Sequence, residues 1–138
     1  MKIVVLKFGG TSVGTIEKIK KVTDIIIEHK KKKNKVIVVS SAMSGVTNDL
    51  IKKSKQISNN FIDSEYDVLV SSGEQVACSL IAGRLNHKGF KSRSWLGWQI
   101  PIFTNGPYTN SRIQQVNKNK LLRFLKEGGI PIITGFQG

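Results

Sequence analysis

IVVLKFGGTSVG, residues 3–14, is the stretch of the sequence that decides the fold. Its first four residues, Ile3 to Leu6, are all apolar and mostly β-branched, which predicts a strand buried on both faces of a parallel sheet. The paired glycines then allow a tight turn, and apolar residues at helical spacing begin just after Gly14. A strand, a glycine turn and a helix in this order are the first part of a βαβ unit.

Strand-like and helix-like segments continue to alternate along the chain. Thr15 is a suitable N-cap for the first helix and Thr47 for the second, because their hydroxyls can accept bonds from free backbone N–H groups. This alternation predicts an α/β fold with three layers, α/β/α, and a mainly parallel sheet. The expected helices cover residues 15–33, 47–57, 73–89 and 118–126, and further strands cover 36–39 and 130–134.

Two parts of the sequence fit this pattern less well. Residues 90–117 contain Trp and Ile residues that suit strands, but two glycines and two prolines interrupt them. The sequence ends at Gly138, directly after a buried-type strand, so we expect a fold that is incomplete at its C-terminus. An apolar edge or face of the sheet would then stay exposed unless another chain covers it.

The composition limits the classes of function. The 138 residues and 39% hydrophobic content suit a single α/β unit. The formal net charge of +13 would attract nucleic acid, anionic membranes or small polyanions such as ATP. Most lysines lie between apolar helix positions and Lys30 to Lys33 fall at a helix C-terminus, which favours solvated helix faces. A nucleic-acid binder is a competing hypothesis that rests on charge alone, because no recognition motif accompanies it.

The cellular location is predicted from what the sequence lacks. The single cysteine, Cys78, excludes an internal disulfide and suits a reducing compartment. The apolar run at the N-terminus, Ile3 to Leu6, is too short for a signal peptide or a membrane span. We therefore expect a soluble, cytoplasmic protein that does not enter a membrane.

Lys7-Phe8-Gly9-Gly10 follows the first strand, at the place where open α/β sheets bind ligands. Glycines let backbone N–H groups approach a phosphate, and Lys7 would offset the charge that develops in phosphoryl transfer. The alternative is a tight turn beside a strand-end lysine. A Walker loop is excluded because Gly14 is followed by Thr-Ile and not Lys-Ser/Thr, and the dinucleotide fingerprint also fails.

Two further polar segments precede expected helices. Residues 40–48, SSAMSGVTN, follow the second strand and should therefore lie at the same sheet edge as Lys7. Local helix capping is the alternative role for their hydroxyls. SSGEQ, residues 71–75, is expected to open the third helix with Glu74 in its first turn. There the helix dipole would favour the carboxylate, or Glu74 would face the pocket and hold a substrate ammonium group.

The motifs KFGGTSVG at 7–14, VVSSAMSGVTNDL at 38–50, SSGEQVA at 71–77 and GFQG at 135–138 resemble, in order, the signatures of aspartate kinases within the amino-acid kinase family. The resemblance implies transfer of the ATP γ-phosphoryl group to the side-chain carboxylate of L-aspartate, giving 4-phospho-L-aspartate for lysine, methionine and threonine biosynthesis. It implies Mg²⁺ with the nucleotide and no metal ligand from this chain. The residues that it implies are Lys7 as catalytic, Lys7, Phe8, Gly9, Gly10 and Ser41 around the nucleotide, and Thr47 and Glu74 around aspartate.

The same resemblance implies that residues 1–138 are the N-terminal part of the catalytic domain. In the family, a Gly-Arg-Gly-Gly-Ser-Asp segment, the nucleotide-base pocket and usually regulatory domains come after GFQG. The alternative hypothesis is therefore a truncated or split-gene fragment that is inactive alone and acts only with a complementary C-terminal chain. The partners expected are L-aspartate and ATP, with a second copy or that complementary chain, and neither a specific nucleic acid nor a membrane.

Overall fold

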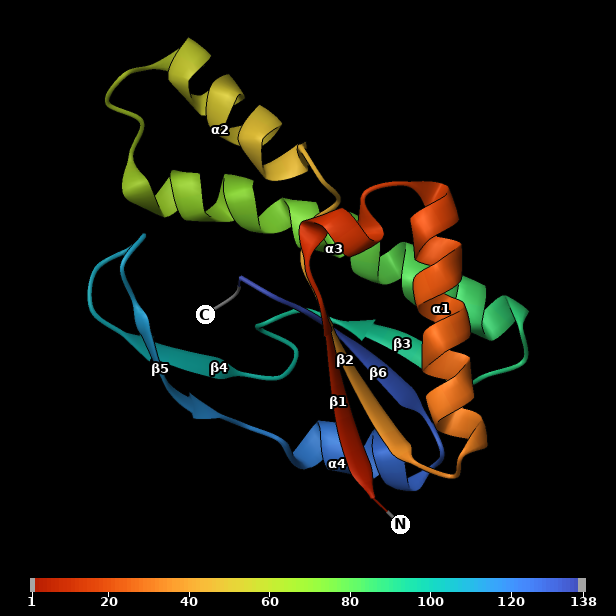
Figure 1. Ribbon diagram of the computed structural model, residues 1–138. Helices are drawn as coiled ribbons and strands as arrows, with labels where there is room; N and C mark the ends of the chain where they lie inside the picture. The colour runs from red at the N-terminus through yellow and green to blue at the C-terminus, as the bar shows by residue number, and fades with distance from the viewer. Residues whose placement is uncertain (1, 137–138) are drawn as a thin grey trace.

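The predicted α/β fold is confirmed in the computed structural model, which describes residues 2–136, although two helices and then three strands follow one another in the middle of the chain (Figure 1). The predicted first strand, first helix, second strand and last strand are all confirmed. The elements are β1 (Ile3–Phe8), a short 3₁₀ helix η1 (Gly10–Val13), α1 (Ile16–Lys31), β2 (Lys35–Ser40), α2 (Val46–Ile57), α3 (Asp63–His87), β3 (Ser92–Trp95), β4 (Ile102–Asn105), β5 (Arg112–Val116), α4 (Asn119–Lys126) and β6 (Ile130–Thr134).

The main sheet has four parallel strands in the order β1-β2-β6-β3. Lys7 is level with Val39 and Ser40 is level with Thr134, so β1, β2 and β6 end at the same edge. The loops that follow these three strands therefore lie together, as expected for the carboxyl edge of a parallel sheet. The antiparallel pair β4-β5 forms a separate two-stranded sheet from the segment that the sequence left uncertain.

Helices pack on both faces of the sheet, which confirms the three-layer prediction. On one face, Val36, Val38 and Ile132 join side chains of α1 and α3 in the main core, including the fully buried Ile26 and Ile81. The next residue along β6, Ile133, points to the opposite face. There it packs with Trp95 of β3, with Ile100 and with Leu121 of α4. Successive residues of a strand face opposite sides, so α4 forms the third layer.

The prediction that the first strand is buried on both faces is wrong. Among residues 2–136, β1 is an edge strand that pairs only with β2, and Ile3 and Val5 are 49% and 61% exposed. Their side chains alternate with Val4 and Leu6, which are partly covered. β1 lies at the border of the sheet because, in the part of the chain that the structure describes, no strand pairs with its other edge.

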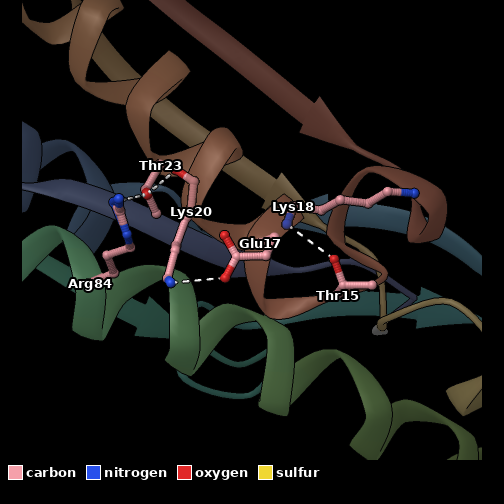
Figure 2. Close-up of polar contacts among 6 residues, drawn as sticks. All are labelled: Thr15, Glu17, Lys18, Lys20, Thr23 and Arg84. Atoms are coloured by element: carbon pink, nitrogen blue, oxygen red, sulfur yellow. Dashed lines mark hydrogen bonds and ion pairs between the residues drawn. The ribbon is translucent and has the colours of Figure 1, made fainter.

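Polar contacts fix α1 at its start and against α3 (Figure 2). The Thr15 hydroxyl accepts a hydrogen bond from the Lys18 backbone N–H at 3.2 Å, which confirms the predicted N-cap. The Arg84 guanidinium donates to the buried Thr23 hydroxyl at 2.8 Å and to the Asp24 carboxylate at 3.1 Å. Arg84 therefore links the two long helices that cover one face of the sheet.

Two predicted helix starts are wrong. α2 has Gly45 and not Thr47 as its N-cap, because Gly45 adopts the left-handed conformation with φ 85° that few other residues tolerate. α3 begins at Asp63, ten residues before Gly73, with Asp63 and Glu65 in its first turn. Glu74 therefore lies in the middle of this helix and gains nothing from its N-terminal dipole. In residues 2–136, no helix is long and apolar enough to cross a membrane.

Candidate active site

A cavity of about 390 Å³ opens at the carboxyl edge of the sheet. Its walls come from the end of β1, the loop after β2, the first turn of α2, the middle of α3 and the segment after β6. Residues far apart in the sequence therefore converge on a single site. Those used in the argument below are Lys7, Gly10, Ser41, Ser44, Thr47 and Glu74.

The loops after β1 and β2 are held against each other by backbone contacts. The Ser41 backbone N–H donates to the Phe8 carbonyl at 3.0 Å. A Cβ atom at Gly10 would lie 3.1 Å from the Ala42 carbonyl oxygen, which is tighter than ordinary van der Waals contact. Only glycine at position 10 allows this approach without a shift of either loop. Lys7, at the end of β1, and Ser41, directly after β2, both line the cavity.

The start of α2 contributes hydrogen-bond donors to the same cavity. Gly45 turns the chain into the helix, and Ser44, Thr47 and Asn48 line the cavity around it. The first backbone N–H groups of a helix have no partner within the helix and carry partial positive charge. Together with Lys7, this end of the site therefore suits an anion.

A close helix contact places Glu74 in the cavity. Gly73 of α3 faces α2, where an added Cβ would lie 3.0 Å from the Ala42 Cβ and 3.1 Å from Val46 Cγ1. This close approach seats Glu74 against the loop that follows β2. Glu74 is 4% exposed, and its Oε2 atom has no hydrogen-bond partner among the described residues.

The environment of Glu74 disfavours its charge in the free protein. Burial raises the pKa of the Glu74 carboxyl, and hydrogen bonds with the backbone at Glu74 and Ala42 only partly oppose that effect. A buried carboxyl oxygen without a partner is costly unless a ligand supplies a donor. Glu74 therefore marks the part of the site that suits a cationic group.

Cys78 lies one turn beyond Glu74 and takes no part in this chemistry. Burial, with a smaller contribution from the Glu74 charge, raises the pKa of the Cys78 thiol to about 12. A thiol in this state is not a nucleophile at neutral pH. It is a core residue, packed in the main cluster with Ala77 and Ile81.

Most of the site residues singled out from the sequence come together, and two do not line the cavity. Lys7, Gly10, Ser41, Thr47 and Glu74 all line it. Phe8 instead turns its side chain to the main core, and Gly9 precedes η1 outside the cavity lining. Either residue could reach a ligand here only through its backbone. Gly135 and Phe136 also line the cavity, whereas Gln137 and Gly138 of the GFQG motif lie outside the described residues.

Three further residues of the 40–48 segment line the cavity beside Ser41 and Thr47, and the sequence motifs do not single them out. They are Ser44, Gly45 and Asn48. Their positions between a strand end and a helix start were the available signal. The described residues contain no cluster of three His, Cys, Asp or Glu side chains that could hold Mg²⁺. Glu74 is the one acidic residue among those that line the cavity.

The chain belongs to the amino acid kinase family, whose profile it matches over residues 2–138. Within that family it is similar to aspartokinases. It is 47% identical over 138 residues to the aspartokinase of Geobacillus stearothermophilus and 44% identical over 141 residues to that of Rickettsia conorii. Each alignment covers 100% of this chain but 34% and 35% of the relative, so the chain spans about a third of the length of these proteins.

Solved structures agree with this assignment of the fold. The aspartate kinase from Synechocystis superposes with a TM-score of 0.83 at 34% sequence identity, over 96% of this chain and 22% of that one. Aspartokinase III of E. coli, solved in complex with aspartate and ADP, superposes with a TM-score of 0.80 at 20% identity, over 98% of this chain and 40% of that one. The α/β architecture with its parallel sheet is therefore that of the family.

Proposed function

We propose that the chain is the phosphate- and amino-acid-binding portion of an aspartate kinase. The observation that carries the proposal is the meeting of a lysine, two closely packed loops and a buried carboxyl without a partner in one cavity. The similarity to aspartokinases over the whole chain supports aspartate as the acceptor. In this reaction a carboxylate oxygen of L-aspartate attacks the γ-phosphorus of ATP, the bond to the β,γ-bridging oxygen breaks, and ADP leaves.

The two ends of the cavity suit the two substrates. Lys7, the backbone around Gly10, Ser41 and the start of α2 form the end that suits phosphate oxygens. Phe8 and Gly9 would add backbone N–H groups only. Such groups act by position and charge, so no covalent intermediate on the protein is needed.

Glu74 suits the ammonium group of an amino acid, and Thr47, which lies among the donors at the start of α2, would contact the same substrate. An ammonium group beside Oε2 of Glu74 would provide the missing partner and would favour the charged carboxylate. Because burial raises the pKa of Glu74 in the free protein, binding of the ammonium group and ionisation of Glu74 are coupled. Mg²⁺ would be carried largely by nucleotide phosphates and water, since magnesium commonly uses few protein ligands in kinases.

A second candidate function is that of a fragment that works only with a complementary chain. The chain covers about a third of its relatives, and the apolar residues Ile3 and Val5 of β1 are exposed. In that case the phosphate end would bind nucleotide, but turnover would require groups from the other chain. Both candidates predict that Lys7 binds the nucleotide phosphates. They differ in whether the chain turns over its substrates alone.

Titration of ATP·Mg²⁺ into the chain, followed by calorimetry, tests the proposal. Lys7→Met should weaken binding roughly 10- to 100-fold, because a charge-assisted contact is worth about 1.5–3 kcal/mol. Lys2→Met removes the same charge at the opposite end of β1 and should leave binding unchanged. Equal effects of the two substitutions on a folded chain would reject the site.

ADP production then separates the two candidate functions. It is measured with and without L-aspartate, for the chain alone and mixed with a separately supplied C-terminal half of a kinase domain. Aspartate-dependent turnover by the chain alone would establish the first candidate, and turnover only in the mixture would establish the second. ATP binding without turnover in either sample would contradict the kinase reaction while leaving the phosphate site intact.

A further inference from the structure

Asn105 is the last residue of β4 and is followed by Gly106, and no other asparagine of this sequence precedes a glycine. The side-chain amide of an asparagine can be attacked by the backbone nitrogen of the next residue. This reaction is intramolecular, so its rate depends on how easily the two groups meet. Glycine carries no side chain that would hinder the approach, and it adopts the widest range of backbone conformations. Asn105-Gly106 is therefore the place in the chain where such an attack is easiest.

The structure leaves both reacting groups accessible. Asn105 and Gly106 are exposed, and the side-chain amide of Asn105 has no hydrogen bond to any other residue in the range 2–136. Gly106 has φ 87°, and only the Asn110 carbonyl oxygen, at 3.8 Å, lies near the position of an added Cβ. The amide of Asn86, by contrast, is fixed by three hydrogen bonds to Ala82 and Ser92. The Asn105 amide is thus free to turn toward its own backbone.

We propose that Asn105-Gly106 is a site of spontaneous deamidation, with water as the only co-reactant. The Gly106 nitrogen attacks Cγ of Asn105, a new C–N bond forms, and the bond from Cγ to the side-chain nitrogen breaks. Ammonia leaves with the proton of the Gly106 N–H, and a five-membered succinimide remains. Water then opens this ring at either carbonyl carbon. One product is aspartate, and the other is isoaspartate, in which the backbone continues through Cγ.

Both products place a negative charge opposite Arg112. Asn105 is level with Arg112 in the antiparallel pairing of β4 with β5. Opposite charges at directly facing positions of two strands attract each other. The aspartate product keeps the length of the backbone, so it should retain the hairpin and gain a cross-strand ion pair.

The isoaspartate product should change the hairpin tip, which we define as residues 106–111. The Thr109 backbone N–H donates to the Asp67 carboxylate at 2.8 Å and so ties the tip to the first part of α3 (Figure 1). Thr109 has φ 63°, which is unusual for a β-branched residue and shows that the path of the tip is closely determined. Isoaspartate adds a methylene group to the backbone just before this path begins. We therefore expect the contact between Thr109 and Asp67 to be lost in this product.

Mass spectrometry of the folded chain after incubation at mildly alkaline pH tests the reaction. Trypsin cuts after Arg93 and Arg112 and releases both Asn105 and Asn110 in one peptide, residues 94–112. The mass gained when an amide becomes a carboxylate should appear at Asn105 severalfold faster than at Asn110. The rate should rise with pH, because the attacking nitrogen must lose its proton.

Two references make this experiment decisive. Asn105→Gln should show no gain at position 105, because ring closure would need a larger ring. A synthetic peptide of residues 94–112 reports the reactivity of the sequence without the fold. Conversion in that peptide but not in the folded chain would overturn the proposal, as would equal conversion of Asn105 and Asn110.

Hydrogen exchange of the Thr109 amide, followed by NMR, tests the effect on the tip. The isoaspartate form, separated by chromatography, should exchange severalfold faster than the original chain, and Asp67→Ala should reproduce this change. Asn105→Asp is the matched control, because it adds the charge without lengthening the backbone, and its exchange should stay slow. Slow exchange in the isoaspartate form would contradict the loss of the contact with α3.

Discussion

Glu74 is a buried side chain of the candidate site whose protonation depends on the fold. A buried carboxyl with one oxygen unpartnered is neutral over a wider pH range than an exposed one, since burial raises its pKa. The stability associated with the neutral form is complete below the ordinary pKa of glutamic acid. It is lost as the pH rises through the raised pKa of the folded chain.

Glu74→Gln should remove this loss. The melting temperature of the variant relative to the original chain should rise by a few degrees between pH 4 and pH 8, measured by circular dichroism. Glu127→Gln is the matched control with the opposite sign, because the hydrogen bond from Lys91 lowers the pKa of Glu127. If the melting temperatures of Glu74→Gln and the original chain differed by the same amount at both pH values, the raised pKa of Glu74 would be contradicted.

Two glycines of α3 provide a matched test at the scale of the element. Gly73→Ala places a methyl group 3.0 Å from the Ala42 Cβ and should destabilise the chain by about 1–3 kcal/mol through overpacking. Gly83→Ala meets no atom within 4 Å and should stabilise it by about 1 kcal/mol through helix propensity. Urea unfolding at a concentration where the chain is monomeric measures both. Stabilisation by both substitutions would show that α2 and α3 are not in close contact.

The link between α1 and α3 gives a second test. Arg84→Met leaves the Asp24 carboxylate and the buried Thr23 hydroxyl without their guanidinium partner, and we expect a loss of about 1–2 kcal/mol. Lys20→Met breaks only the exposed pair with Glu17 and should cost much less than Arg84→Met, because solvent screens this pair. Equal losses in urea unfolding would mean that Arg84 contributes no more than a surface charge.

The elements that the sequence predicted correctly are those whose signals are local. Ile3 to Leu6 is a short apolar run before glycines, and Thr15 caps a helix with regular apolar spacing, so β1 and α1 need no distant information. The start of α3 could not be placed in this way. Ser71-Ser72-Gly73 has the composition of a helix start, but α2 packs against Gly73 and helical structure continues through it.

The same distinction applies to the site. Convergence of Lys7, Ser41 and Thr47 follows from two adjacent parallel strands, which the alternating pattern predicts. The missing partner of Glu74 Oε2 could not be predicted, because it depends on how closely Ala42 approaches Gly73. The side chain of Phe8 could not be placed either, because an edge strand gives no pattern that separates its two faces.

At the scale of the whole molecule, the exposed residues of β1 make the sheet prone to association. An unpaired strand edge that carries exposed Ile3 and Val5 can pair with other chains. Val5→Lys should reduce light scattering at high protein concentration severalfold without lowering the melting temperature. Ile57→Lys, an equally polar change at an exposed position of α2, should not. Unchanged light scattering with Val5→Lys would show that the chains associate through another surface.

The position of β6 has a consequence for how the chain acquires its structure during synthesis. The last strand in the sequence is an inner strand of the sheet, bonded to β2 on one side and β3 on the other. Residues as distant as Val38 and Ile132 must meet, so folding has a high contact order and should be slow. During synthesis, β3 can join β1 and β2 in the sheet only after β6 has emerged from the ribosome, and chaperones would have their largest effect in that interval.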